Sequence, residues 1–406
     1  MDFAPSPRVS DLRRRLGAFM EAHVHPAEDE VARWLESRPD RWAAPPPQIE
    51  ELKRRARAEG LWNLWLTEPG VYDAQAPGLT HLEFAPLAEI MGRSPLAPEV
   101  FNCAAPDVGN MELLRCHGSA EQKVRWLTPL LAGEIRSGLA LTEPAVASSD
   151  ATNIEGRIER LGDHLILNAR KWWVTGAGDP RCRVLLVMGR IDPAAPPRRQ
   201  HAILLVPMDA PGVSVRRALP VFGFDHAPQG HMEVHFENVR VPADHLVGAP
   251  GEGFGIVRER LAPVRVHQCM HLIGMAEQAL ALACRRARAR AVLGKPLADQ
   301  GGVLERLADS RVEIDQARLL TLRAAWTLDT QGATEARREI AMAKLAVPAM
   351  ACRVIDRAIQ IHGSLGLCED TPLARAYAWA RALRLADGPD EMHAAQLGRL
   401  ELAHHQ

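Results

Sequence analysis

The chain has 406 residues, of which 47% are hydrophobic and 24% are charged, as in globular proteins with two or three domains or sub-domains. Its 49 Lys and Arg balance 50 Asp and Glu, so no positive surplus attracts a nucleic acid. No apolar run reaches the roughly 20 residues that span a bilayer, the N-terminus lacks a signal-peptide core, and the seven Cys lack the spacing of metal ligands or of a disulfide framework. These features predict a cytoplasmic protein with no nucleic-acid partner, no membrane partner and no metal.

Residues 1–133 are predicted to form an N-terminal α-helical domain. Apolar residues recur at helical spacing in 9–24, 48–66 and 119–133. Ser10 is a candidate N-cap, and Ser119 with Gln122 matches a capping box. The tetrapeptide Leu-Thr-Glu-Pro at 66–69 is followed by a turn-rich stretch, so this copy is predicted to be a structural loop.

Residues 134–247 are predicted to form a middle β domain. The stretches "RVLLVMGRI", "HAILLVPM" and "GHMEVHFENVRVP" are short β-rich runs divided by Pro- and Gly-containing turns. They indicate a small sandwich or barrel. His231 and His235 lie four residues apart and share one face of the last run, where we interpret them as ordinary strand residues.

Residues 248–406 are predicted to form a C-terminal four-helix bundle. Long helical patterns cover 254–290, 301–329, 335–363 and 372–388. The "GEGFG" at 251–255 lacks the rest of a dinucleotide fingerprint and indicates a turn that begins a helix. His267 and His271 are interpreted as core or cavity-lining residues. The fold class is therefore α+β in the order helices, β domain, helices, without the βαβ alternation of a Rossmann domain.

Two stretches of the β segment contain residues suited to a ligand. The second Leu-Thr-Glu-Pro, at 141–144, is followed by "AVASSD", whose small and hydroxyl residues let backbone N–H groups and hydroxyls approach a phosphate or a polar ring edge. Trp172 and Trp173 are adjacent on a predicted strand and should point to opposite faces. One of them would cover a planar cofactor, or both would be core aromatics.

These stretches together resemble the acyl-CoA dehydrogenase family. The resemblance runs through Thr142–Asp150, Asn168–Thr175, "GEGFGIVRERL", "QIHGSLG" and "RALRLADGPDEMH", and it covers nearly the whole chain. It is closest to the branch that is fused to a kinase-like domain in animals. It implies FAD, an acyl-CoA substrate oxidised to the trans-2-enoyl-CoA in fatty acid β-oxidation, an electron-transfer flavoprotein as electron acceptor, and a homo-oligomer, either a dimer or a tetramer.

The resemblance also assigns roles to individual residues. Asp387 stands where the family has its catalytic base. The implied cofactor-binding residues are Leu141, Thr142, Ser148, Ser149, Trp173, Thr175, Arg290, Gln360, Gly363, Ser364 and Glu391. The implied substrate-binding residues are Ser149, Arg265 and Gly388. Arg290 and the 360–364 turn are expected to reach the FAD of a neighbouring subunit.

The sequence departs from the family pattern at five places, one of which is the run "AVASSD" at 145–150, with one residue more than the family's motif. The base is usually Glu, and Asp387 is shorter by one methylene. Val264 occupies the family's other base position and cannot accept a proton, so Arg265 beside it either contacts substrate or orients the Asp387 loop. Leu293 and Gly301 replace an aromatic residue and a Gln. A flavin oxidase on the same fold and a non-catalytic flavin-binding relative remain as alternatives.

Overall fold

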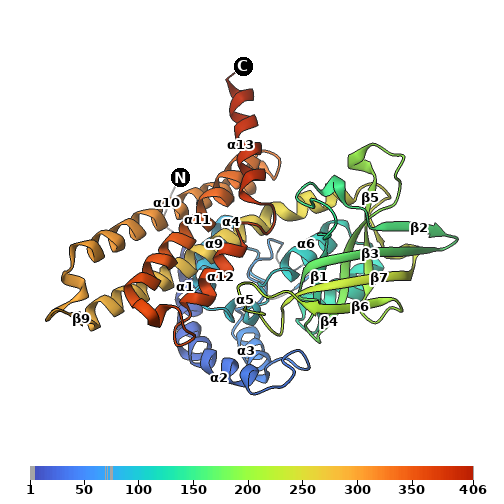
Figure 1. Ribbon diagram of the computed structural model, residues 1–406. Helices are drawn as coiled ribbons and strands as arrows, with labels where there is room; N and C mark the ends of the chain where they lie inside the picture. The colour runs from blue at the N-terminus through green and yellow to red at the C-terminus, as the bar shows by residue number, and fades with distance from the viewer. Residues whose placement is uncertain (1–4, 69, 71, 74–75, 406) are drawn as a thin grey trace. The chain divides into compact units, whose positions relative to one another are not determined.

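The computed structural model describes residues 5–68, 70, 72–73 and 76–405. Pro69, in the first Leu-Thr-Glu-Pro, lies outside these ranges. The chain begins with helices, continues as strands and ends with helices (Figure 1), which confirms the predicted α–β–α order. None of the helices in the described ranges combines the length and the apolar character needed to cross a bilayer.

The N-terminal segment is helical as predicted. Its helices are α1 (Pro7–Phe19), α2 (His25–Glu36), α3 (Pro47–Ala58), α4 (His81–Met91), α5 (Ala97–Val100), α6 (Asp107–His117), α7 (Ala120–Gln122) and α8 (Thr128–Leu131). The capping box of Ser119 and Gln122 is confirmed. The predicted N-cap Ser10 is wrong: Ser6 caps α1 by accepting from the N–H of Val9, because Pro7 begins the helix one turn earlier.

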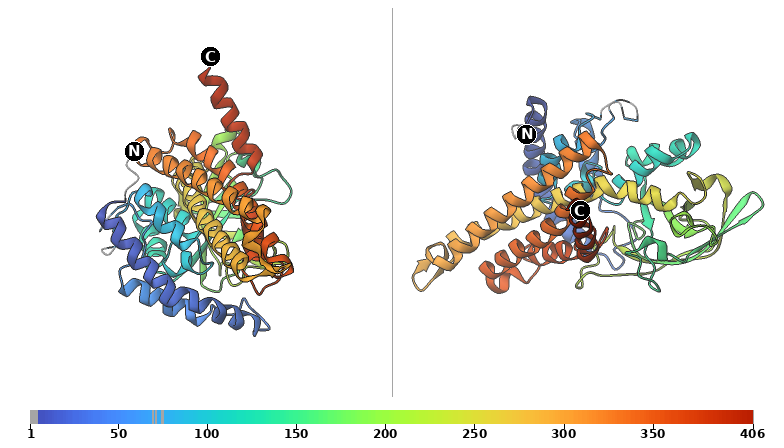
Figure 2. Two further views of the ribbon diagram at one scale, coloured as in Figure 1. Left: turned by 90° about the vertical axis from the view of Figure 1, so that its left-hand side faces the viewer. Right: turned by 90° about the horizontal axis from the view of Figure 1, so that it is seen from above.

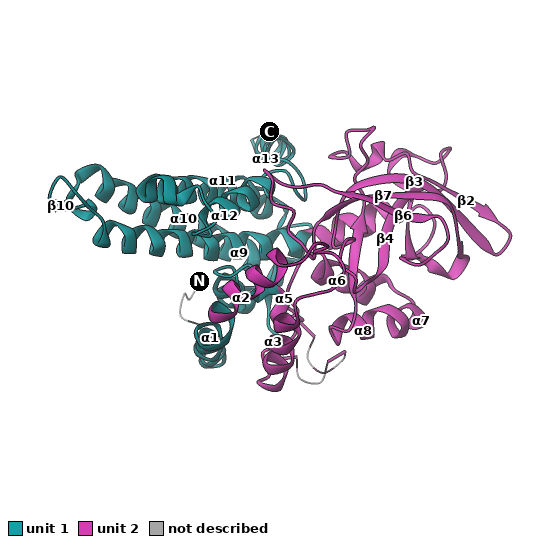
Figure 3. Ribbon diagram, turned by 60° about the horizontal axis from the view of Figure 1, so that its bottom comes forward, with its two compact units in different colours: residues 1–25, 79–98, 262–406 teal, residues 26–78, 99–261 magenta. Residues whose placement is uncertain are grey.

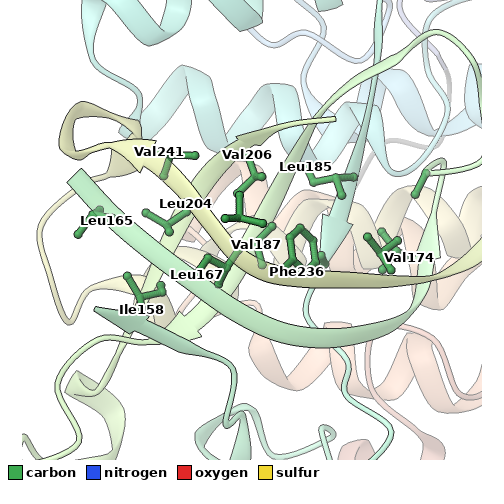
Figure 4. Close-up of a cluster of buried hydrophobic side chains, with 14 of the residues drawn as sticks. Ile158, Leu165, Leu167, Val174, Leu185, Val187, Leu204, Val206, Phe236 and Val241 are labelled. Carbon is green, nitrogen blue, oxygen red and sulfur yellow. The ribbon is translucent and has the colours of Figure 1, made fainter. Parts of the chain in front are cut away.

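The β segment is one curved eight-stranded sheet. Its strands are β1 (Arg136–Ala140), β2 (Arg157–Leu161), β3 (His164–Thr175), β4 (Cys182–Arg190), β5 (His201–Pro207), β6 (Val213–Ala218), β7 (His231–Pro242) and β8 (Leu246–Val247). They follow the order β6-β7-β3-β2-β4-β5-β8, with β1 parallel to β4. Leu204 on β5 and Phe236 on β7 belong to one buried cluster although several strands separate them in this order (Figure 4). The sheet therefore bends around a common core, as in a sandwich or barrel.

The C-terminal segment contains α9 (Gly253–Ala289), a small hairpin of β9 (Ala291–Val292) and β10 (Lys295–Pro296), α10 (Gly301–Gln331), α11 (Arg337–His362), α12 (Leu373–Ala382) and α13 (Asp390–His404). Helices α10, α11 and α12 lie side by side (Figure 2). The helix predicted over 372–388 is shorter in the structure, and α13 follows it as a fifth helix. Turns continue from its end to Ala386, and the left-handed backbone of Asp387 and Gly388, followed by Pro389, separates these turns from α13.

Contacts between residues divide the chain into two compact units (Figure 3). The helical unit contains 1–25, 79–98 and 262–406, and the sheet unit contains 26–78 and 99–261. The segments 1–133, 134–247 and 248–406 describe the order of the elements, and as domains they stay a prediction.

Candidate active site

In the sheet unit, a buried ion pair fixes the second Leu-Thr-Glu-Pro against β3. The Nζ of Lys171 donates to Glu143 Oε1 at 2.7 Å and to the carbonyl of Leu141 at 2.9 Å. The Glu143 carboxylate also accepts from the N–H groups of Glu155 and Gly156, each at 2.8 Å. Burial lowers the pKa of Lys171 to about 8, although Glu143 opposes that change. Because a buried charge left without its partner typically costs about 3–5 kcal/mol, this pair holds the loop in one position.

The loop after β1 is held by the hydroxyl of Ser148 and by the backbone carbonyl of Thr142. Ser148 Oγ accepts from the N–H of Glu143 at 2.9 Å. The carbonyl of Thr142 accepts from the N–H of Trp172 at 3.0 Å. Leu141, Thr142 and Ser148 are thus brought together along β3, and Ser149 is exposed beside them.

The two Trp of β3 stand in a β-bulge. The register against β7 shifts between Lys171 and Val174, so the expected alternation of the two rings on opposite faces is interrupted there. Trp173 has a φ of +54°, a conformation that costs a bulky residue roughly 1–3 kcal/mol. Its ring is 41% exposed and lies 6.4 Å from that of Trp172. Bulges of this kind re-aim side chains and are common beside active sites.

Thr175, at the end of β3, is paired with a histidine that sequence reasoning missed. His231 is its register partner on β7, and His231 Nδ1 lies 2.9 Å from Thr175 Oγ1. The His231 ring also lies 5.6 Å from the Trp173 ring. Burial, with a smaller contribution from His226, lowers the pKa of His231 to about 4. The imidazole is therefore neutral near pH 7 and has one donating and one accepting nitrogen.

These groups fit a flat ring with polar edges, such as the isoalloxazine of FAD. Trp173 offers a partly exposed aromatic face. Trp172 Nε1 is buried and has no hydrogen-bond partner within the described ranges, and a donor in that state calls for an acceptor. The Thr175 hydroxyl and the small residues after Thr142 add further polar groups beside β3.

In the helical unit, Asp387 lies on a turn between α12 and α13 that is held from two other helices. Asp387 and Gly388 have φ angles of +56° and +104°. Arg265, on α9, donates from Nε to the carbonyl of Asp387 at 2.9 Å. Lys344, on α11, donates from Nζ to the carbonyls of Leu383 at 2.8 Å and Ala386 at 2.9 Å. Asp387 is therefore a partly accessible carboxylate on a rigidly anchored loop.

Gly388 cannot be replaced without distortion. A Cβ on it would lie 3.0 Å from Met392 Sδ and 3.1 Å from His393 Nε2, and its φ disfavours other residues. Burial lowers the pKa of His393 to about 4, so this neighbour is neutral near pH 7. Val264, next to Arg265, is buried and apolar, and the assignment of Asp387 as the base stays a prediction.

The remaining predicted cofactor residues lie elsewhere in the helical unit. Arg290 follows the last residue of α9, and the exposed Gln360 precedes the exposed turn of Gly363 and Ser364 at the end of α11. Lys344, which contacts the Asp387 loop, lies about 27 Å along α11 from the end of that helix, at a rise of about 1.5 Å per residue. Within one chain, the structure therefore does not bring the 360–364 turn to Asp387. Glu391 is exposed in the first turn of α13.

Sequence reasoning missed the three supporting residues Glu143, Lys171 and Lys344 as well as His231. Lys344 had a usable signal, since it is a lone cation within the apolar run "IAMAKLAVPAM". Lys171 lies on a buried position of β3. Their partners lie 28 to 42 residues away, which local patterns do not reveal.

The comparisons with known proteins agree with these features. Residues 138–239 match the family model "Acyl-CoA dehydrogenase, middle domain", and residues 251–401 match "Acyl-CoA dehydrogenase, C-terminal domain". A probable acyl-CoA dehydrogenase, FadE2, of Mycobacterium tuberculosis is 52% identical over 99% of this chain and 97% of its own length. Acyl-CoA dehydrogenase family member 10 of the mouse is 52% identical over 98% of this chain, which spans 37% of that protein.

Solved structures give the same result. A structure described as a putative acyl-CoA dehydrogenase from Mycobacterium abscessus has a TM-score of 0.95 and 51% identity, with 100% of both chains covered. A structure described as PigA with FAD and proline has a TM-score of 0.81 over 98% of both chains, and at 23% identity it supports the fold alone. With relatives of this identity over almost its whole length, the chain belongs to the acyl-CoA dehydrogenase family of oxidoreductases.

Proposed function

We propose that the protein binds FAD and oxidises an acyl-CoA thioester to the trans-2-enoyl-CoA. The observation that supports this most directly is Asp387, a carboxylate at the family's base position, on a turn that Arg265 and Lys344 anchor through its carbonyls. A non-catalytic relative would have no need of such an anchored carboxylate.

Asp387 takes the proton from the α-carbon of the thioester. Its side chain is shorter than that of Glu by about 1.5 Å, so the substrate binds deeper or the left-handed turn brings the backbone forward. The negative charge that develops on the thioester oxygen is stabilised by the N–H of Asp387, in the manner of an oxyanion hole. The bound flavin supplies the acceptor for the hydrogen that leaves the β-carbon as hydride.

The FAD is held by two groups of residues. Leu141, Thr142, Ser148, Ser149, Trp173 and Thr175 hold the isoalloxazine and the start of the pyrophosphate, with Ser149 also near the substrate. Arg290, Gln360, Gly363 and Ser364 of a neighbouring subunit, together with Glu391, hold the remainder. This division is supported by the separation of the 360–364 turn from Asp387 along α11.

A homo-oligomer, dimer or tetramer, is supported by an apolar stripe on α10. The stripe consists of Leu304, Val312, Leu319 and Trp326, which are 40% to 54% exposed. Their spacing of eight, seven and seven residues places them within an arc of about 80° on the helix. Such a continuous exposed stripe is typical of a surface that another chain covers.

The electron acceptor is an electron-transfer flavoprotein.

An anaerobic titration tests the reaction. The purified protein, loaded with FAD, is mixed without oxygen with acyl-CoAs that differ in length and branching, and the flavin absorbance is followed. We expect at least one acyl-CoA to bleach the flavin and to yield the trans-2-enoyl-CoA. A panel that never bleaches it would contradict the proposal, and rapid oxygen consumption during turnover would favour the oxidase alternative.

A further inference from the structure

Lys344 is a buried cation that anchors the Asp387 turn from a different helix. Its side chain is about 2% exposed, in the middle of α11. Burial lowers its pKa, and the negative charge of Asp387 is the largest effect that opposes this. A buried ammonium is costly unless its hydrogens find acceptors, and the acceptors of Lys344 are the carbonyls of Leu383 and Ala386. Lys344 therefore caps the end of α12 from a different helix.

The bond to Ala386 has a geometric consequence for Asp387. The only cis peptide bonds within the described ranges precede Pro106 and Pro228, so the peptide between Ala386 and Asp387 is trans. In a planar trans peptide the C=O and the N–H point in opposite directions. Fixing the Ala386 carbonyl toward Lys344 therefore fixes the Asp387 N–H in the direction away from Lys344.

Arg265 does the same for the next peptide. It holds the Asp387 carbonyl, and the Gly388 N–H points the opposite way. Neither N–H has a hydrogen-bond acceptor within the described part of the chain. Consecutive N–H groups on a turn with left-handed residues form a concavity that suits an anionic oxygen.

We infer that Lys344 is a positioning residue for the reaction: by holding the carbonyl of Ala386, it aims the N–H of Asp387 at the thioester oxygen of the substrate. This inference rests on the proposed function. It assigns to Lys344 no contact with substrate or flavin. It predicts that replacing Lys344 weakens the stabilisation of the negative charge that develops on the thioester oxygen and leaves the binding of FAD unchanged.

The test uses a 3-oxoacyl-CoA of the same chain length as the best substrate. Such a compound ionises between its two carbonyls but is not dehydrogenated, so the pH at which the bound probe becomes an enolate reports the stabilisation of the oxyanion. We expect Lys344→Met to raise that pH by about 1 to 2 units, which is a 10- to 100-fold weaker stabilisation of the enolate. Removing an oxyanion-hole donor outright costs about 100- to 1,000-fold, and a misaimed donor should cost less.

A second variant and a control keep the test decisive. If Lys344→Met does not fold, Lys344→Gln takes its place. The shorter Gln side chain cannot reach both carbonyls, so it should give a smaller shift in the pH of probe ionisation than the one expected for Lys344→Met. Lys53 is the matched control, since it is also buried and donates from Nζ to a backbone carbonyl, that of Gly133, at 2.8 Å. Lys53→Met should lower the thermal midpoint while leaving the probe's ionisation unchanged.

The possible results separate the inference from the proposed function. If the wild-type flavin is bleached by an acyl-CoA, and the folded Lys344 variants ionise the probe at the wild-type pH, the inference is wrong and the proposed function stands. A shift in Lys53→Met equal to that in Lys344→Met would also overturn it, because general loosening would then explain both. If no acyl-CoA bleaches the wild-type protein, the proposed function itself fails.

Discussion

Trp173 and Asp387 both occupy left-handed backbone conformations, with φ angles of +54° and +56°, and the bulky side chain of Trp173 disfavours its own. Such conformations persist where the surroundings impose them, and they concentrate at functional sites. In both places the surroundings are visible. A bulge opposite β7 imposes the first, and hydrogen bonds from Arg265 and Lys344 impose the second. Tertiary contacts thus set the backbone conformation of Trp173, a proposed flavin-binding residue, and of Asp387, the proposed base.

The role of Asp387 as a base leads to a prediction about Asp387→Asn. Asn tolerates a left-handed backbone almost as well as Asp, so the loop and the FAD content should be preserved. The amide cannot accept the α-proton, and anaerobic flavin reduction should slow by about 100- to 10,000-fold. Stopped-flow absorbance measures that rate. Reduction at the wild-type rate would show that another group removes the proton.

At the scale of elements, long helices were predictable because their apolar period is repeated over many turns. The residues at which the helices end were less predictable. The helix predicted over 372–388 ends at Ala382, and the carbonyls of Leu383 and Ala386 that follow it are held by Lys344, 39 and 42 residues away. The bulge in β3 was equally hidden, since it depends on the register with β7. The base loop and its anchor Arg265 were found only through the resemblance to a family, and its second anchor, Lys344, was found through the structure.

The apolar stripe of α10 gives a prediction at this scale. Val312→Glu combined with Leu319→Glu places two charges on residues that are 54% and 49% exposed, so the isolated chain should fold normally. Burying those charges between subunits is costly, and we expect a smaller assembly in sedimentation analysis. FAD should also be retained less well if a neighbour's Arg290 and 360–364 turn help to hold it.

Val124→Glu is the control for that experiment. Val124 is 74% exposed in the short π-helical segment Lys123–Leu127, outside the α10 stripe. It should leave the sedimentation profile unchanged. An unaltered assembly in the double variant would show that α10 faces solvent in the oligomer, or that the protein is a monomer throughout.

At the scale of the whole molecule, buried histidines make the stability sensitive to mild acid, and His231 and His393 are two of them. Burial lowers the pKa of both His231, in the sheet unit, and His393, in the helical unit, to about 4. In the unfolded chain both titrate near 6.5. The carboxylate of Glu233 affects stability at lower pH, because hydrogen bonds from His235 and Arg170 lower its pKa to about 2. Its stabilising contribution is present above about pH 4.5 and is lost only as the pH falls toward 2.

The last prediction concerns the pH range from about 6.5 down to 5. There the unfolded chain takes up protons at His231 and His393 while the folded protein does not, so the free energy of unfolding falls as the pH falls. For a fully buried group the loss approaches ~3 kcal/mol when the pH reaches the folded pKa.

His231→Gln removes one titrating group and can still hydrogen-bond to Thr175, so its thermal midpoint should be lower than the wild type's at pH 8 but should fall less between pH 7 and pH 5. The exposed His405, whose side chain is 75% accessible, provides the control, and His405→Gln should follow the wild-type curve. Parallel curves for the wild type and His231→Gln would mean that His231 titrates normally in the folded protein, and its assignment as a neutral partner of Thr175 would be wrong.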